Sequence, residues 1–489
     1  MRFRLHIGSV MGSAARLLIF PLLSLCAPAI AQSSGAAEAS EVEQLRATVQ
    51  ALQRRVETLE RQQNHTANEI TTDNGQGAAE LAEAAHDLHS GEAAQSPSTT
   101  VSASKQVIPA LPSQLPGGAT LNYAFDGYYE YNFNHPVGRV NYLRAYDVLS
   151  NSFSVQQADI IFALDPDVSA NRRYGVRLDL QFGQATDTLQ GSRSNEPRPE
   201  IYQNIFQAYG TYIFPVGKGL QVDFGKWASS LGIEGNYTKD QMNYTRSFYF
   251  NFLPFYHAGI RANYKLNDKV AVNYWIVNGT DQTEPTNSFK DELFGIVVQP
   301  AKQVSWTINY YLGQDHPDAT QGTSCAPAPV QTGLCLIPIS PAPDGKIHIF
   351  DSYATWTATP KWTLAAEADY AIEREWANAA PRESSAPAHV AGGAAYAQYQ
   401  LNPRLSFAAR GEYLADPQGL FSNISQTLKE GTATAKYLVA SNFYTFFEYR
   451  RDWSNQNYFL TNKPGLLSGQ QPTTTVGVVW WYGGKQGPW

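Results

Sequence analysis

Residues 121–134 read "LNYAFDGYYEYNFN", and their side chains alternate in character almost without interruption. Leucine, tyrosine and phenylalanine recur at the odd positions, whereas most even positions carry asparagine, aspartate or glutamate. A period of two indicates an extended strand with two unlike faces. In a soluble sandwich the apolar face would form the core, and in a membrane barrel it would face lipid. The rest of the chain decides between these arrangements.

The same alternation recurs from residue 119 to the C-terminus. Further segments of this kind cover residues 176–182, 220–224, 258–266, 270–276, 304–312, 362–370, 405–413 and 474–482. We expect short turns at residues 165–173, 215–219, 267–269, 300–303, 359–361, 401–404 and 439–442. Long polar loops are expected at residues 135–151, 184–203, 228–255, 280–290, 313–345, 372–388, 415–424 and 453–471. Strict alternation of short and long connections is typical of outer-membrane barrels, whose turns are periplasmic and whose loops lie outside.

Eight long loops and seven short turns require sixteen strands, and we expect this number to hold within about two. Residues 119–489 are therefore predicted to form an antiparallel up-and-down transmembrane β-barrel. Side chains cannot fill so wide a lumen, so the apolar parity must face lipid, which excludes a soluble barrel. Aromatic residues cluster at strand ends, as expected for interfacial girdles: Tyr128, Tyr129, Tyr131, Phe133, Trp480, Trp481 and Tyr482.

The polar parity predicts the residues that line the lumen: Asp126, Glu130, Arg177, Asp179, Asp223, Arg261, Glu367, Asp369, Arg410, Glu412, Glu448 and Arg450. Acids only slightly outnumber bases within residues 119–489, which predicts a weak cation preference. A phosphate-selective channel would need a ladder of arginines or lysines. A sugar-specific channel would need a row of lumen aromatics, for which the candidates are Tyr128, Trp275, Tyr311, Tyr396 and Tyr444.

The N-terminal region predicts export. Arg2 and Arg4 precede an apolar run at residues 17–31, which ends in Ala-Ile-Ala, so residues 1–31 read as a cleaved signal peptide. Lipidation at Cys26 is a less favoured alternative because Leu25, rather than a small residue, precedes the cysteine. A retained membrane anchor is less favoured still.

Residues 41–62 carry a heptad pattern, with apolar residues in steps of three and four: Val42, Leu45, Val49, Leu52, Val56 and Leu59. One such helix alone is marginal in water, so the pattern predicts self-association of a short coiled coil, with a trimer favoured. A dimer and a solitary amphipathic helix are the alternatives. Residues 63–118 are rich in small and polar residues without periodicity, and they predict a disordered linker.

Two cysteines remain after removal of the signal peptide, Cys325 and Cys335. We expect them to form a disulfide because an exported chain enters an oxidising compartment. Two free thiols or a zinc site are less favoured. The formal net charge of −7 over 489 residues argues against nucleic-acid binding. The chain shows no recognisable catalytic constellation, so we expect neither an enzyme nor a cofactor.

Several motifs give the chain a family resemblance: "DGYYEYNFNHP", "NSF", "GKW", "NYTRSFYF", "PFYHAGIRA", "RGEYLADPQG" and "EYRRDWSN". In this order they resemble the second putative β-barrel porin family, over essentially all of residues 119–489. The resemblance implies a Gram-negative outer-membrane barrel that passes small solutes, with the coiled coil in the periplasm. It implies no particular substrate. A barrel that tethers the membrane to periplasmic partners, and a sugar- or anion-selective porin, are the alternatives.

The loop at residues 228–255 is the candidate constriction. In the general porins, which a sixteen-stranded barrel resembles, the corresponding loop folds inward and narrows the channel. Here Glu234, Lys239, Asp240 and Arg246 are expected to supply opposing charges there. The alternative is a surface loop whose aromatic segment, residues 248–256, packs at the barrel rim.

Overall fold

The computed structural model describes residues 115–189, 196, 198–314, 319–321, 336–338, 345–374 and 386–483. The predicted signal peptide, coiled-coil helix and disulfide, as well as Cys26, lie outside these residues.

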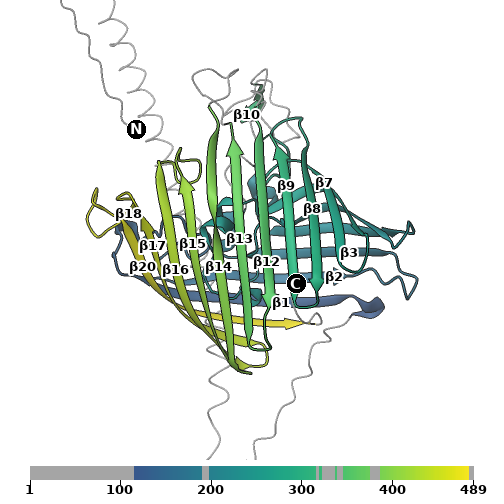
Figure 1. The fold of residues 1–489 in the computed structure, drawn as a ribbon, viewed down its shortest axis with the longest axis horizontal. Helices are drawn as coiled ribbons and strands as arrows, with labels where there is room; N and C mark the ends of the chain where they lie inside the picture. Colours follow the sequence, from purple (N-terminus) through teal and green to yellow (C-terminus); the bar gives the residue numbers. More distant parts are fainter. Residues whose placement is uncertain are drawn as a thin grey trace, which may run out of the picture. The chain divides into compact units, whose positions relative to one another are not determined.

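Sixteen antiparallel strands form one closed barrel (Figure 1), which confirms the predicted fold class. The strands are β1 (Thr120–Asn132), β2 (Phe153–Leu164), β3 (Tyr174–Phe182), β4 (Ile205–Phe214), β5 (Leu220–Ala228), β6 (Tyr256–Lys265), β7 (Val270–Val277), β8 (Asp291–Ala301), β9 (Val304–Gly313), β12 (Ile347–Thr357), β13 (Trp362–Glu373), β14 (Ala388–Asn402), β15 (Leu405–Asp416), β16 (Gln426–Ala440), β17 (Phe443–Ser454) and β20 (Gln470–Gly483). Each strand pairs with the next one around the ring, and β20 closes the barrel on β1, with Tyr128 opposite Gly477. Closure leaves no unpaired strand edge, as a membrane-spanning sheet requires.

Outside the barrel strands, the described residues form short elements only. These are η1 (Pro116–Gly118), η2 (Val137–Arg139), α2 (Gln184–Leu189), α3 (Pro199–Tyr202), η3 (Thr238–Asp240), α4 (Phe248–Phe252) and two small hairpins, β10 (Ala319–Gln321) with β11 (Leu336–Pro338) and β18 (Phe459–Leu460) with β19 (Leu467–Ser468). Within the described residues, no helix has both the length and the apolar character to cross a membrane.

Short turns gather at one end of the barrel and long loops at the other, at the positions predicted from the sequence. Local chemistry accounts for the turn between β2 and β3. There the carboxylate of Asp167 accepts hydrogen bonds from the Ser169 hydroxyl (2.5 Å) and from the Ala170 N–H (3.0 Å), which lower the pKa of Asp167 below its usual range. Asn171 adopts the left-handed conformation that completes this turn (φ 60°).

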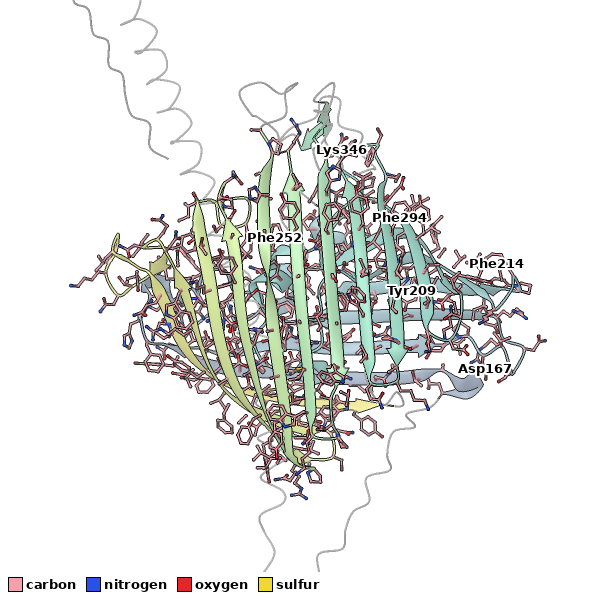
Figure 2. The ribbon with its side chains drawn as sticks, in the orientation of Figure 1. Asp167, Tyr209, Phe214, Phe252, Phe294 and Lys346 are labelled. Carbon is pink, nitrogen blue, oxygen red and sulfur yellow. The ribbon has the colours of Figure 1, made fainter. Side chains whose placement is uncertain are left out.

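Most strand positions place apolar side chains outward and polar side chains inward, except near the loop end, where apolar side chains such as Leu293 and Ile349 also face inward. Phe214 and Phe294 lie on the exposed outer face (Figure 2), and the two neighbours of Phe294 on β8, Leu293 and Gly295, are buried.

Two members of the predicted aromatic girdles are exceptions. The Tyr128 side chain faces the barrel interior, where its hydroxyl donates a hydrogen bond to Gln184 Oε1 (2.8 Å). The Trp481 side chain also lies on the inner face, where its ring stacks on that of Tyr444. The girdle assignment of both was wrong because clustering at a strand end does not determine which face a residue occupies, whereas strand parity also places Tyr128 among the candidate lumen aromatics.

Candidate functional site: a loop across the barrel lumen

The loop between β5 and β6, residues 229–255, crosses the barrel lumen. On one side the Tyr244 hydroxyl donates a hydrogen bond to Asp126 Oδ1 on β1 (2.6 Å). On the other side the backbone carbonyl of Ser230 accepts one from Asn309 Nδ2 on β9 (3.0 Å). Because β1 and β9 are eight strands apart in the sixteen-strand ring, one loop contacts opposite walls. We name residues 229–255 the lumen loop.

Carboxylates on the inner wall hold the backbone of the lumen loop. The two oxygens of Glu412 accept hydrogen bonds from the N–H groups of Phe248 and Tyr249, both at 2.9 Å. Glu448 accepts those of Tyr244 (2.6 Å) and Thr245 (3.0 Å) in the same manner. Hydrogen bonds to a charged acceptor are stronger than neutral ones, so these two glutamates fix the loop against β15 and β17.

The aromatic part of the lumen loop packs inside the barrel. Ser247 caps α4, since its hydroxyl accepts a hydrogen bond from the Phe250 N–H (2.9 Å). The helix turns Phe248 and Tyr249 into an apolar cluster in which neither has measurable exposure. Wall residues from the loop end of the strands complete this cluster: Trp227, Trp275, Val277, Leu293, Tyr311, Ile347, Ile349, Ala371, Val390, Leu414 and Leu428. The aromatic segment therefore does not form an outer girdle.

The four charged residues predicted for the loop have different surroundings. Glu234 forms an ion pair with Arg410 of β15 (2.7 Å), and Lys239 forms one with the neighbouring Asp240 (2.7 Å). Arg246 is buried, and its guanidinium donates to the backbone carbonyls of Gly235, Asn236 and Tyr244 within the loop. Arg246 thus holds the loop conformation, and the structure does not bring these four charges together as two opposing sets.

A chain of buried charges runs along the inner wall beside the loop. Arg410 Nε contacts Glu430 (2.9 Å), Arg450 Nε contacts Asp452 (2.8 Å), and Arg144 Nη2 contacts the same Asp452 (2.9 Å). Burial lowers the pKa of Arg144, but the adjacent carboxylates, led by Asp452, outweigh burial and raise it above its ordinary value. Strand parity would have identified Glu430 and Asp452 as lumen residues. It gives no signal for Arg144, which lies in the loop between β1 and β2.

All twelve residues predicted to line the lumen lie on the inner parity of their strands, and all except Arg261 are almost fully buried. Two oppositely charged pairs occur within this set, Arg177 with Asp179 (2.8 Å) and Arg261 with Asp223 (2.6 Å). Among the buried charged side chains of the described residues, Asp and Glu outnumber Lys and Arg by more than two to one. The interior is therefore more acidic than the composition of residues 119–489 indicates.

The aromatic candidates for a sugar path do not form one row. Trp275 and Tyr311 belong to the apolar cluster of the lumen loop, Tyr128 and Tyr444 belong to a second cluster, and Tyr396 belongs to a third. At the opposite end, near the short turns, a polar cavity of about 250 Å³ is lined by Gln398, Gln400, Pro403, Arg404, Ser406, Lys436, Leu438 and Tyr444. The interior is thus narrowed by the lumen loop and polar near the turns.

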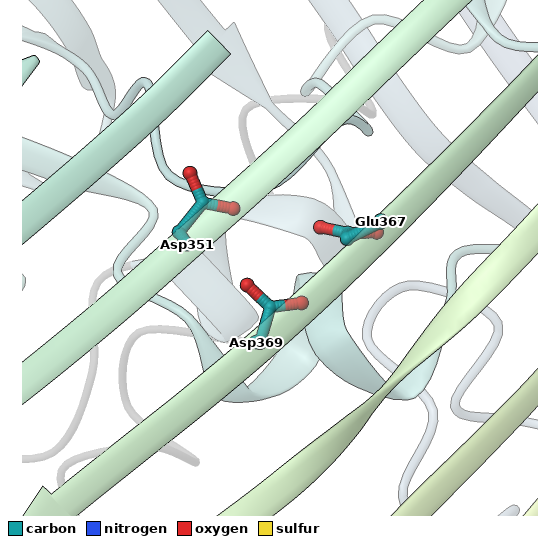
Figure 3. Close-up of side chains that lie close together, drawn as sticks. All are labelled: Asp351, Glu367 and Asp369. Atoms are coloured by element: carbon teal, nitrogen blue, oxygen red, sulfur yellow. The ribbon is translucent and has the colours of Figure 1, made fainter. Parts of the chain in front are cut away.

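Three carboxylates on the inner wall gather near the start of the lumen loop: Asp351, Glu367 and Asp369 (Figure 3). Asp351 lies on a strand that the sequence pattern did not identify, whereas Glu367 and Asp369 were both predicted to face the lumen. This set contains the oxygen ligands that hard metal ions prefer.

Comparison with known proteins identifies one family. The family described as "Putative beta-barrel porin-2, OmpL-like" matches residues 119–480. Among solved structures, a loop L8 deletion mutant of OmpT, an outer membrane protein of Vibrio cholerae, is 10% identical, with a TM-score of 0.46 over 74% of this chain and 99% of that one. An anion-selective porin from Comamonas acidovorans is 7% identical, with a TM-score of 0.45 over 74% and 99%. Salmonella typhi OmpF is 13% identical, with a TM-score of 0.43 over 74% and 97%. A search of curated proteins found no match.

Proposed function

Since the chain belongs to the Putative beta-barrel porin-2 family, we propose that it is a porin of a Gram-negative outer membrane through which small hydrophilic solutes and ions diffuse passively. The observation that carries this proposal is the lumen loop, which spans a charged barrel interior from Asp126 on β1 to Asn309 on β9. A barrel built only as a membrane anchor has no need of a polar interior narrowed in this way.

Filtering by size and charge follows from this geometry. The lumen loop reduces the width available to solutes at the level of Glu412 and Glu448. The acidic excess of the buried side chains attracts cations and repels anions, because charges along a narrow path act through a low effective dielectric. We therefore propose a preference for cations. The largest solute that passes should be smaller than a sixteen-stranded barrel without such a loop would admit. An anion- or sugar-selective porin is less favoured.

Liposome swelling tests the proposal directly. Purified protein in vesicles should admit small sugars and amino acids at rates that fall steeply with solute size. A cationic amino acid should enter faster than an anionic one of similar size. A folded barrel that admits no solute at all would contradict passive diffusion, and the alternative of a structural tether would then be the better account.

The N-terminal region completes the proposal. Asn122 of β1 pairs with Gly483 of β20, so both ends of the barrel lie at the end that carries the short turns, which we take as periplasmic. Residues 1–31 would be removed on export, and residues 41–62 would join subunits in the periplasm, with a trimer favoured. Deletion of residues 41–62 should lower the molecular mass of the native oligomer in detergent without loss of the folded barrel.

A further inference from the structure

The three carboxylates of Figure 3 come from two adjacent strands. Asp351 of β12 is the direct register partner of Asp369 of β13, and Glu367 lies two residues before Asp369 on the same inner face. One oxygen from each of the three lies within 4.8 Å of the others. Three negative charges at this separation repel one another strongly unless a positive charge or protons accompany them.

Asp369 is buried without a donor among the described residues. It is 6% exposed, yet neither of its oxygens accepts a hydrogen bond from them. None of the three carboxylates forms an ion pair with a described lysine or arginine, and the nearby Arg410 is already paired with Glu234 and Glu430. Buried oxygens without donors are uncommon and call for a partner.

The other two carboxylates are fixed by the lumen loop. Asp351 Oδ1 accepts a hydrogen bond from the Gly232 N–H (3.1 Å), and Asn309 Nδ2 donates to its second oxygen (2.8 Å). Glu367 accepts one from the Ile233 N–H (3.0 Å) and one from the Tyr396 hydroxyl (3.3 Å). The surroundings therefore hold Asp351 and Glu367 in place beside Asp369, whose two oxygens lack a partner among the described residues.

We propose that Asp351, Glu367 and Asp369 bind a divalent cation of the Ca²⁺ class. Ca²⁺ takes oxygen ligands from carboxylates, and the cluster offers three of these without histidine or cysteine, which zinc and copper favour. The cation supplies the missing partner of Asp369 and removes the mutual repulsion. If the proposed porin function holds, the bound cation also strengthens the attachment of the lumen loop at residues 232–233 and lowers the current of monovalent cations.

Terbium luminescence tests binding without reference to transport. The full-length barrel, folded in detergent, is titrated with Tb³⁺, whose emission is sensitised by nearby tyrosines such as Tyr396, and the bound Tb³⁺ is then displaced with Ca²⁺. We expect saturable emission that Ca²⁺ abolishes, and at least a tenfold loss of affinity in Asp369→Asn. Asp159→Asn is the matched control, because Asp159 is also buried with both oxygens lacking a donor but lies outside the cluster. This variant should bind as the unaltered protein does.

The thermal unfolding temperature is a second readout, and it also shows whether each variant is folded. Ca²⁺ should raise the thermal unfolding temperature of the unaltered protein and of Asp159→Asn, and should leave that of Asp369→Asn and Asp351→Asn unchanged. Absence of Ca²⁺-displaceable emission in the unaltered protein, or an equal response of Asp369→Asn and Asp159→Asn, overturns the proposed site. Because both readouts are taken without a current, failure of the porin function leaves them unaffected.

Discussion

Glu412 of β15 accepts a hydrogen bond from the backbone N–H of Phe248 at 2.9 Å, which ties the lumen loop to a strand 164 residues further along the chain. The second oxygen of Glu412 accepts the N–H of Tyr249. Wall carboxylates thus do more than face the lumen, since they hold the backbone of the loop that crosses it. The width of the proposed channel depends on these bonds.

Glu412→Gln should loosen the lumen loop. Glutamine keeps one acceptor oxygen but loses the charge, so the attachment should weaken by about 1.5–3 kcal/mol, the usual contribution of a hydrogen bond to a charged group. We expect a larger and noisier single-channel conductance, together with faster hydrogen exchange at residues 244–249.

The control for this variant is Asp268→Asn, which removes an acid from an exposed turn at the other end of the barrel. Its conductance and exchange should match those of the unaltered protein. Equal conductance of Glu412→Gln and Asp268→Asn would mean that this bond does not set the channel width.

Arg410→Met should destabilise the barrel. The substitution leaves Glu234 and Glu430 buried without their common partner, and loss of one member of a buried ion pair costs about 3–5 kcal/mol. Urea unfolding in lipid vesicles measures this cost. The stability of Arg410→Lys should fall between that of Arg410→Met and that of the unaltered protein, since lysine keeps the charge but lacks the forked donors of the guanidinium. Lys218→Met, at an exposed turn, should have an effect close to zero.

Lys436→Gln should strengthen the cation preference. The Lys436 amine lies on the inner wall and donates to the backbone carbonyls of Lys239 (2.9 Å) and Gln241 (3.2 Å) of the lumen loop. Its removal deletes one of few inward positive charges, so the reversal potential in a salt gradient should move further toward the cation limit. Lys269→Gln, in a short exposed turn, should not move it. A shift of equal size in both variants would indicate a general surface-charge effect.

Phe294→Arg tests which face of the wall meets lipid. Phe294 is 47% exposed on β8 (Figure 2), and an arginine on the lipid face costs a barrel about 2–4 kcal/mol at the middle of the bilayer and less toward either interface. Folding measurements in vesicles should show this cost. Val168→Arg, in the exposed turn between β2 and β3, should show nearly none. A neutral effect at position 294 would place that residue in water.

The disulfide between Cys325 and Cys335 is a separate prediction. Alkylation followed by mass spectrometry should modify both cysteines of the mature chain only after reduction. Alkylation without reduction would show free thiols.

Strand alternation predicted the barrel, and the succession of short and long connections predicted its strand number and the ends at which loops and turns lie. The alternation failed for β12, where Ile347 and Ile349 are apolar yet face inward. Those two residues pack against the lumen loop. Their inward side chains are apolar because a segment distant in the sequence buries them, and the local sequence pattern cannot show this. The contact of Glu412 with Phe248 likewise depends on closure of the barrel. Spacing along the chain therefore predicts which side chains face inward but not which of them meet.

Single-channel recording of the refolded protein in a planar bilayer, with a salt gradient across it, tests the porin account most directly. We expect stable conductance steps and a reversal potential of the sign that indicates cation preference, as the acidic interior requires. Absence of conductance from protein shown to be a folded, heat-modifiable barrel would contradict the account.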